Sequence, residues 1–278
     1  MIRVHHLNCG SLRPLGGKFI DGQPGLLRRA RLVCHCLLLE TGSGLVLVDT
    51  GFGTHDVANP RTLGPMRPVI HPLLDLEETA ARQVVRLGFV VEDVRHIVLT
   101  HLDLDHAGGL ADFPHARVHL HATEHAVAVA AGKLKPPDSL RYRAHQWAHG
   151  PDWALCEPSG EPWFGFEAAR ELKGLPSEIL MIPLAGHSRG HTGVAVDTGD
   201  GWLLHAGDAY FFHGEMGPDK RRCTSGLRVF QTMAEADRKS RRANQERLLE
   251  LVRSHGSEIT TVSAHDESEY LRYAGTGS

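Results

Sequence analysis

The stretch "LTHLDLDHAGGL", residues 99–110, places His101, Asp103, Asp105 and His106 directly behind an apolar run. Ionisable side chains this close together repel one another or leave polar atoms unsatisfied unless a cation holds them. Histidine nitrogens and carboxylate oxygens are ligands of zinc, iron and manganese in proteins. The stretch therefore predicts a metal site at the end of a buried strand.

Three later apolar runs also deliver a metal-binding side chain at their ends. His187 ends "ILMIPLAGH", Asp208 ends "GWLLHAGD", and His265 lies at the end of "ITTVSAHD". A single histidine at a strand end is more often a structural or surface residue, but that explanation is poor for four strand ends together. Loops at strand ends carry the reactive groups of α/β proteins, so we expect these side chains to converge.

The composition narrows the class of protein. A length of 278 residues fits one large domain covering residues 1–278, and a hydrophobic content of 41% is ordinary for a globular protein. The net charge of -3 gives no basic surface for nucleic acid or an anionic membrane, so we expect neither as a partner. The start "MIRVHHLNCG" lacks the pattern of a signal peptide, and no apolar stretch approaches the ~18 residues of a membrane span. We therefore expect a cytoplasmic protein.

The five cysteines are odd in number and widely scattered, which does not indicate a disulfide framework. Cys34 and Cys36 flank His35 and could form half of a zinc site. However, they alternate with apolar residues over Leu32–Leu39, which favours a strand with buried thiols.

Strand-like and helix-like segments interleave along the chain, but hairpins are frequent, which favours two mixed sheets over one parallel sheet. The predicted strands cover 31–40, 44–51, 94–101, 116–121, 178–187, 192–208 and 258–266, and the predicted helices cover 74–89, 122–132 and 234–255. The pattern breaks down over residues 133–177, which we interpret as an irregular insertion near the active site.

Taken in order, these motifs resemble those of the metallo-β-lactamase superfamily. The superfamily pattern H-x-H-x-D-H is matched by residues 101–106 with Asp103 in the second position, and Gly108-Gly109 follow. The other matching motifs are "VDTG" at 48–51, "GHSRG" at 186–190, Gly207-Asp208 and His265. The resemblance covers about residues 32–267 and implies a four-layer αβ/βα sandwich, in which helices flank two mixed β-sheets.

The resemblance also implies a ligand set for two divalent metal ions. One ion would bind His101, His187 and Asp103; the other would bind Asp105, His106 and His265; and Asp208 would bridge them. A hydroxide between the ions would be the nucleophile, with Asp105 at the reacting centre. Asp49 of the "VDTG" motif would orient the histidines from behind.

Asp103 departs from the commonest superfamily pattern, which has histidine there. A carboxylate is a harder, anionic ligand, so it favours iron or manganese over zinc, although zinc also accepts carboxylates. Two divalent ions are then balanced by three carboxylates and one hydroxide, which favours a neutral substrate. An aspartate is also shorter than a histidine. If it fails to reach the metal, one tight and one weak metal position result.

The activity that fits best is hydrolysis of a small ester or lactone, as in the N-acyl homoserine lactonases of the superfamily. Phosphodiesterase and thioesterase activities remain open. So does a di-iron redox protein, because flavodiiron reductases carry a glutamate at the corresponding place; such a protein would need an external electron donor. A sensor or ligand-binding protein with little turnover is a further alternative.

The sequence patterns that point to substrate-binding residues are less specific than those that point to the metal ligands. Tyr210, two positions after Asp208, could donate to an oxyanion. Three tryptophans could hold an apolar chain, two arginines could bind a carboxylate, and residues 11–27 could form a second rim; the candidates are Trp147, Trp153, Trp163, Arg141 and Arg143. Each of these side chains could equally serve packing or the surface. A small-molecule substrate is the expected partner, and a homodimer is compatible with the sequence.

Overall fold

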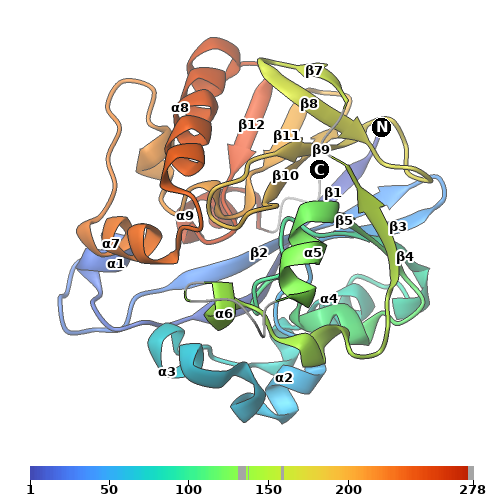
Figure 1. Cartoon of the computed structure of the whole chain (residues 1–278), viewed down its shortest axis with the longest axis horizontal. Coiled ribbons are helices and arrows are strands. Elements are labelled where there is room, and N and C mark those ends of the chain that lie inside the picture. Colours follow the sequence, from blue (N-terminus) through green and yellow to red (C-terminus); the bar gives the residue numbers. More distant parts are fainter. Residues whose placement is uncertain (131–135, 137, 158–159, 275–278) are drawn as a thin grey trace.

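The computed structural model describes residues 1–130, 136, 138–157 and 160–274. Its strands form two six-stranded sheets (Figure 1). The first sheet contains, in spatial order, β1 (Arg3–Leu12), β2 (Leu32–Thr41), β3 (Gly44–Val48), β4 (Val94–Val98), β5 (Arg117–His121) and β6 (Asp152–Cys156). The second contains β12 (Ile259–Val262), β11 (Trp202–His205), β10 (Thr192–Asp197), β9 (Ile179–Pro183), β8 (Phe166–Glu171) and β7 (Glu161–Trp163).

Both sheets are mixed, as predicted. In the first sheet, β1, β2 and β3 pair antiparallel, whereas β3 to β6 run parallel. In the second, β7 to β11 pair antiparallel and β11 runs parallel to β12. The predicted fold class, two mixed sheets flanked by helices, is therefore confirmed.

The helices are short except for two near the C-terminus. They are α1 (Lys18–Asp21), α2 (Thr54–Ala58), α3 (Arg67–Ile70), α4 (Ala80–Arg86), α5 (Ala122–Val129), α6 (Asp138–Arg141), α7 (Ser225–Ala234), α8 (Arg238–His255) and α9 (Glu267–Tyr273). The helix predicted over 234–255 begins later, because Asp237 caps it by accepting from the backbone N–H groups of Lys239 and Ser240. In the described ranges, no helix has the length and apolar character needed to cross a bilayer.

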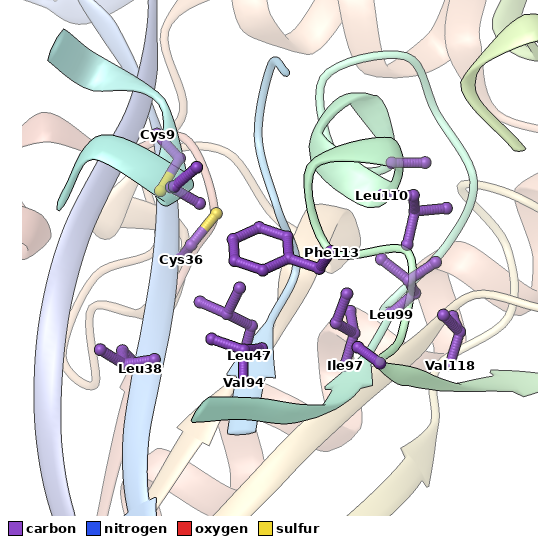
Figure 2. Close-up of a cluster of buried hydrophobic side chains, with 14 of the residues drawn as sticks. Cys9, Cys36, Leu38, Leu47, Val94, Ile97, Leu99, Leu110, Phe113 and Val118 are labelled. Atoms are coloured by element: carbon purple, nitrogen blue, oxygen red, sulfur yellow. The ribbon is translucent and has the colours of Figure 1, made fainter. Parts of the chain in front are cut away.

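Alternation along the strands builds the core in layers. Leu37 and Leu39 of β2 face the second sheet and pack in one cluster with Met181 and Val194. Side chains on the opposite face of the first sheet form a second cluster around Phe113 (Figure 2). A third cluster lies on the outer face of the second sheet and includes residues of α8. Three apolar layers thus hold the two sheets and their covering helices in a fixed relation.

The stretch 133–177 differs from its prediction. Only its first described part, α6 and the 3₁₀ helix Ala144–Trp147, lies beside the candidate site. Residues 152–171 instead supply β6 to the first sheet and β7 and β8 to the second. β6 and β7 are the edge strands of their sheets, and β8 lies between β7 and β9. All three are short and lack a regular alternation of apolar and polar residues, which is the pattern that reveals a strand in a sequence. The expected insertion therefore completes both sheets.

Candidate metal centre

The predicted ligands do converge. The loops after β4, β9, β11 and β12 bring seven side chains to one edge of the sandwich: His101, Asp103, Asp105, His106, His187, Asp208 and His265. All except Asp103 and Asp105 are buried. The position of the cluster therefore depends on strands of both sheets and is not set by any one loop.

Asp208 lies at the centre of the cluster. Its Oδ1 is 3.3 Å from His106 Nε2 and 3.2 Å from His265 Nε2. Its Oδ2 is 3.4 Å from His187 Nε2 and 3.8 Å from His101 Nε2. One carboxylate thus faces histidines on both sides, as expected of a group that bridges two cation positions.

The remaining aspartates divide between the two sides. Asp103 Oδ2 is 3.0 Å from His187 Nε2 and 3.6 Å from His101 Nε2. Asp105 Oδ2 is 3.7 Å from His265 Nε2. Three groups of potential ligand atoms each lie within 4.8 Å of one another: His101–Asp103–His187, His101–His106–Asp208 and Cys34–Asp105–His265. The thiol of Cys34, interpreted from the sequence only as a buried group on a strand, thus lies next to the ligands.

The described residues fit a divalent metal ion. His101 Nε2, His106 Nε2 and Asp208 Oδ1 are buried and have no hydrogen-bond partner among them. Unpartnered buried polar atoms are costly, and a cation between them removes that cost. Two ligands at ~2.0–2.1 Å from one tetrahedral ion lie about 3.3 Å apart. The 3.2 and 3.3 Å separations around Asp208 Oδ1 match that value.

Hydrogen bonds behind the histidines fix which ring nitrogen faces the cluster. Asp49 Oδ2 accepts from His106 Nδ1 at 2.9 Å and from Thr100 Oγ1 at 2.8 Å, and Asp49 Oδ1 accepts from the Thr100 N–H at 2.8 Å. Because the Thr100 hydroxyl donates to Asp49, it accepts from His101 Nδ1 at 2.9 Å. His265 Nδ1 donates to the Val33 carbonyl at 2.7 Å. Each Nε2 therefore offers a lone pair, and Asp49 lies where it was predicted.

Two glycines allow these loops to approach closely. A Cβ on Gly108 would lie 2.6 Å from the Gly51 carbonyl oxygen, so the loop after the H-x-D-x-D-H motif can pack against the Asp49 loop only without a side chain. Gly207 has φ +53°, and a Cβ there would lie 2.6 Å from His191 Nε2. His191 Nε2 accepts from the Asp208 N–H at 2.9 Å, which holds the bridging residue in place.

Sequence reasoning missed His191 and Glu124. Glu124 is fully buried; its Oε1 accepts from the Leu102 N–H at 3.2 Å, and its Oε2 accepts from Ser188 Oγ at 2.7 Å and the Gly190 N–H at 3.0 Å. It thereby ties the loop of His101 to the loop of His187. In the sequence it is only an acidic residue in the first turn of a helix, so no signal separates it from an ordinary helix start.

Charge within the cluster favours a bound cation. Burial acts to raise the pKa of Asp208, but His265, His106 and His187 hold it well below its usual range. Burial likewise acts to raise the pKa of Asp103, but the Arg141 guanidinium and His101 hold it well below that range. Both carboxylates are therefore ionised, Asp208 among histidines and Asp103 beside a guanidinium.

A cavity of about 540 Å³ opens onto Asp103, Asp105, His187, Asp208 and His265. Its walls are apolar and come from three segments: residues 12–20, residues 66–70 and α7. Leu12, Pro14, Leu15 and Ile20 confirm that part of the predicted rim over residues 11–27 lines the pocket. The cavity lies in the size range of small-molecule sites.

The other predicted substrate residues need correction. Trp147 and Trp153 pack against the cluster around Phe113, and Trp163 lies in the cluster under α8, so all three serve the core. Arg143 donates to the carbonyls of Leu63, Tyr142 and Leu140, which makes it a loop-fastening residue. Arg141 does line the cavity.

Tyr210 is also not where an oxyanion donor must be. It is fully buried among the apolar residues under α8. Its hydroxyl donates to the Glu269 carboxylate, 3.0 Å from each oxygen. Burial, together with the charge of Glu269, raises the pKa of Tyr210 well above its usual value. The predicted catalytic role of Tyr210 is therefore wrong.

A two-sheet sandwich with this histidine and aspartate cluster defines a metal-binding α/β protein whose ligands come from strand ends of both sheets. Residues 29–256 match the family described as the metallo-beta-lactamase superfamily, and the chain belongs to it. It is 44% identical over 269 residues to probable metallo-hydrolase Rv2300c of Mycobacterium tuberculosis, covering 97% of this chain and 82% of that protein. The chain is thus a metallo-hydrolase by family.

Likeness to lactonases is more distant. An N-acyl homoserine lactonase of Bacillus thuringiensis is 32% identical over 96 residues, which cover 34% of this chain and 38% of that protein. A solved N-acyl homoserine lactone hydrolase, with N-hexanoyl-L-homoserine bound at its catalytic metal centre, superposes with a TM-score of 0.72. That match has 20% identity and covers 97% of this chain and 95% of the other, so it shows a shared fold.

Proposed function

We propose that the chain hydrolyses a small neutral ester or lactone with an apolar acyl group, using divalent metal held by the histidine and aspartate cluster. The observation that carries this proposal is the apolar cavity of about 540 Å³ that opens directly onto the cluster. An acyl chain in that cavity removes apolar surface from water, and its carbonyl then lies beside the metal ligands.

The charges around the cavity favour a neutral substrate. Its ionisable lining residues are Asp103, Asp105, Arg141, His187, Asp208 and His265. The one arginine among these lining residues, Arg141, already pairs with Asp103 at 2.9 Å. The lining therefore offers a phosphodiester or a substrate carboxylate no guanidinium free of its own carboxylate partner.

Each reacting group then has a place. A divalent ion in the cluster supplies Lewis-acid polarisation of the carbonyl and lowers the pKa of water. Asp105 lines the cavity, and its carboxylate would take a proton from the attacking water and return it to the leaving alcohol oxygen. Ester and water thereby give acid and alcohol. His265 lies between the two carboxylates: its Nε2 is 3.7 Å from Asp105 Oδ2 and 3.2 Å from Asp208 Oδ1, which places Asp105 beside the bridging residue.

Metal identity and substrate head group belong to the same proposal. Asp103 would favour iron or manganese over zinc if it bound the metal, whereas a site without Asp103 suits zinc as well. The lactonases that resemble this chain act on N-acyl homoserine lactones, so a lactone ring is the first head group to test.

The test is a substrate panel with the metal-loaded chain: N-acyl homoserine lactones of increasing acyl length, matched p-nitrophenyl esters, an acyl thioester and bis-p-nitrophenyl phosphate. We expect the highest kcat/KM for a medium-chain lactone or ester, and loss of turnover in Asp208→Asn. Faster turnover of the phosphodiester or the thioester would assign those activities instead. Binding of the lactone, seen as a raised Tm, without turnover would indicate a ligand-binding protein.

A further inference from the structure

Arg141, from the end of α6, reaches into the metal cluster. Its Nη1 is 2.9 Å from both carboxylate oxygens of Asp103 and 3.1 Å from His187 Nε2. Its Nη2 donates to the His187 carbonyl at 3.1 Å and also to the Ala234 carbonyl. The side chain is only 5% exposed, so protein groups hold this guanidinium firmly in place.

The atoms that Arg141 engages are those expected to hold the first metal ion. Because a guanidinium has only donors, a His187 Nε2 that accepts from it uses the same lone pair that would bind a metal. In the other tautomer, Nε2–H donates to Asp103 Oδ2 at 3.0 Å and has no lone pair for a metal. Both oxygens of Asp103 are likewise directed at Nη1. A divalent ion ~2.0–2.2 Å from these atoms would lie against a fixed positive charge, and the two cations would repel each other.

We propose that the Arg141 guanidinium takes the place of the first metal ion, so that the chain holds a single divalent ion beside Asp105, His106, Asp208 and His265. This replaces the two-ion arrangement predicted from the sequence, and it rests on the proposed metal-dependent function. It also removes Asp103 from the ligand set, so Asp103 no longer selects the metal, and the remaining imidazoles and carboxylates suit zinc as well as iron.

The pairing explains why an aspartate stands at position 103. A histidine there is neutral and would leave the buried Arg141 only the more distant Asp138, whose Oδ1 is 3.8 Å from Arg141 Nε, and a poorly paired buried charge is costly. Conversely, loss of Arg141 removes the fixed positive charge and leaves Asp103 with His187 Nε2 at 3.0 Å and His101 Nε2 at 3.6 Å. His101 Nε2 already lacks a hydrogen-bond partner. Those three groups are a complete potential metal triad. Removing Arg141 should therefore open the first position to a second ion.

The test counts metal without reference to activity. The chain is stripped with a chelator, titrated with Zn²⁺ by calorimetry, desalted and assayed by elemental analysis. Variants are Arg141→Met, Asp103→His combined with Arg141→Met, and Arg143→Met as the matched control. Arg143 is a neighbouring arginine whose guanidinium donates to backbone carbonyls and not to a ligand.

We expect about one equivalent in the unsubstituted chain and in Arg143→Met, and about two in both variants that lack Arg141. The unsubstituted chain is decisive even if a variant fails to fold: two equivalents there, or none, would overturn the proposal. One equivalent that stays one in a folded Arg141→Met chain would also overturn it. One equivalent of metal without ester or lactone turnover would support the single-ion inference and refute the proposed function.

Discussion

Replacing Asp49 with asparagine should weaken metal binding although Asp49 touches no metal. Asn has nearly the same shape and tolerates the left-handed backbone that Asp49 adopts at φ 56°, so the substitution adds no backbone strain. It changes only the charge and one acceptor. The effect therefore isolates the hydrogen bonds behind the cluster.

The geometry decides how the amide is oriented. The Thr100 N–H donates to Oδ1 at 2.8 Å, so the amide oxygen must stay there and the NH₂ group must take the Oδ2 position. That NH₂ then faces His106 Nδ1 at 2.9 Å, a donor opposite a donor. His106 can relieve the clash by moving its proton to Nε2, but Nε2 is the atom that faces Asp208 and the metal position. The wrong tautomer removes a ligand, as in triads whose aspartate is replaced by asparagine.

Loss of such a supporting partner typically costs 10–100-fold in metal affinity, or about 1.4–2.8 kcal/mol. Competition against a chromophoric chelator, with Zn²⁺ and with Co²⁺, measures this change directly. The Tm of the metal-free protein, recorded in parallel, separates weaker binding from poorer folding.

Asp56→Asn is the matched control. Asp56 is as deeply buried as Asp49, and its Oδ2 accepts from the Gly53 N–H at 3.2 Å and from Gln146 Nε2 at 3.0 Å, outside the cluster. We expect it to keep its metal affinity. If Asp49→Asn also kept the affinity of the unsubstituted chain, the argument from tautomers would be refuted.

Three further outcomes are expected. In the lactone or ester series, kcat/KM should rise about fourfold per methylene, the value of ~0.8 kcal/mol per buried CH₂, until the cavity is full; no dependence on chain length would exclude the cavity as the acyl site. Tyr210→Phe should lower the free energy of unfolding in urea by about 1–3 kcal/mol, yet leave kcat/KM unchanged, because its hydroxyl serves Glu269. Burial, together with Asp266, raises the pKa of Glu269 to about 7 from 4.5, so the native state binds this proton more tightly than the unfolded state. Stability should therefore fall as pH rises from about 4.5 to about 7, by on the order of 3 kcal/mol, and Glu269→Gln should abolish that part of the decline, measured by urea unfolding at both ends of the range.

The clustering of the candidate metal ligands could be predicted because each of them lies at a fixed place relative to an apolar run. A buried strand reveals itself by composition, and a polar side chain at its end can be located without knowing the fold. Asp49 was found in the same way. Which ring nitrogen of each histidine faces the cluster depends on Thr100, Asp49 and Val33, and these contacts exist only in the folded chain.

The substrate residues were harder because sequence proximity is a poor guide to direction. Tyr210 follows Asp208 by two positions, but a 3₁₀ turn over Gly207–Ala209 intervenes, and the side chain of Tyr210 ends in the core under α8. The tryptophans of residues 133–177 were likewise predicted to line the pocket, but they pack against the core. Leu227, Phe230 and Met233, which do line the cavity, belong to α7, part of the sequence for which no helix was predicted.

Arg141 shows a different kind of limit. From the sequence, Arg141 was a candidate to bind a substrate carboxylate, but the carboxylate that it contacts in the structure is Asp103 of the same chain, 38 positions away. The sequence does not show that the two residues pair, because Asp103 can be interpreted alone as a metal ligand and Arg141 alone as a substrate-binding residue. Only the folded chain brings the two charges together.

This pair also couples the metal centre to the cavity wall. Arg141 Nη2 donates to the carbonyl of Ala234, the last residue of α7, and α7 supplies the apolar wall. A guanidinium bound at one end to Asp103 and at the other to α7 fixes how far the wall stands from the reacting centre. Arg141→Met should therefore alter two separable quantities: the metal count, through Asp103, and the acyl length at which kcat/KM stops rising, through α7. Because both variants that lack Arg141 are expected to bind a second ion, the acyl-length series is measured with every chain loaded with one equivalent of Zn²⁺. A shifted length preference at this matched metal content would assign the positioning of the wall to Arg141 independently of the metal.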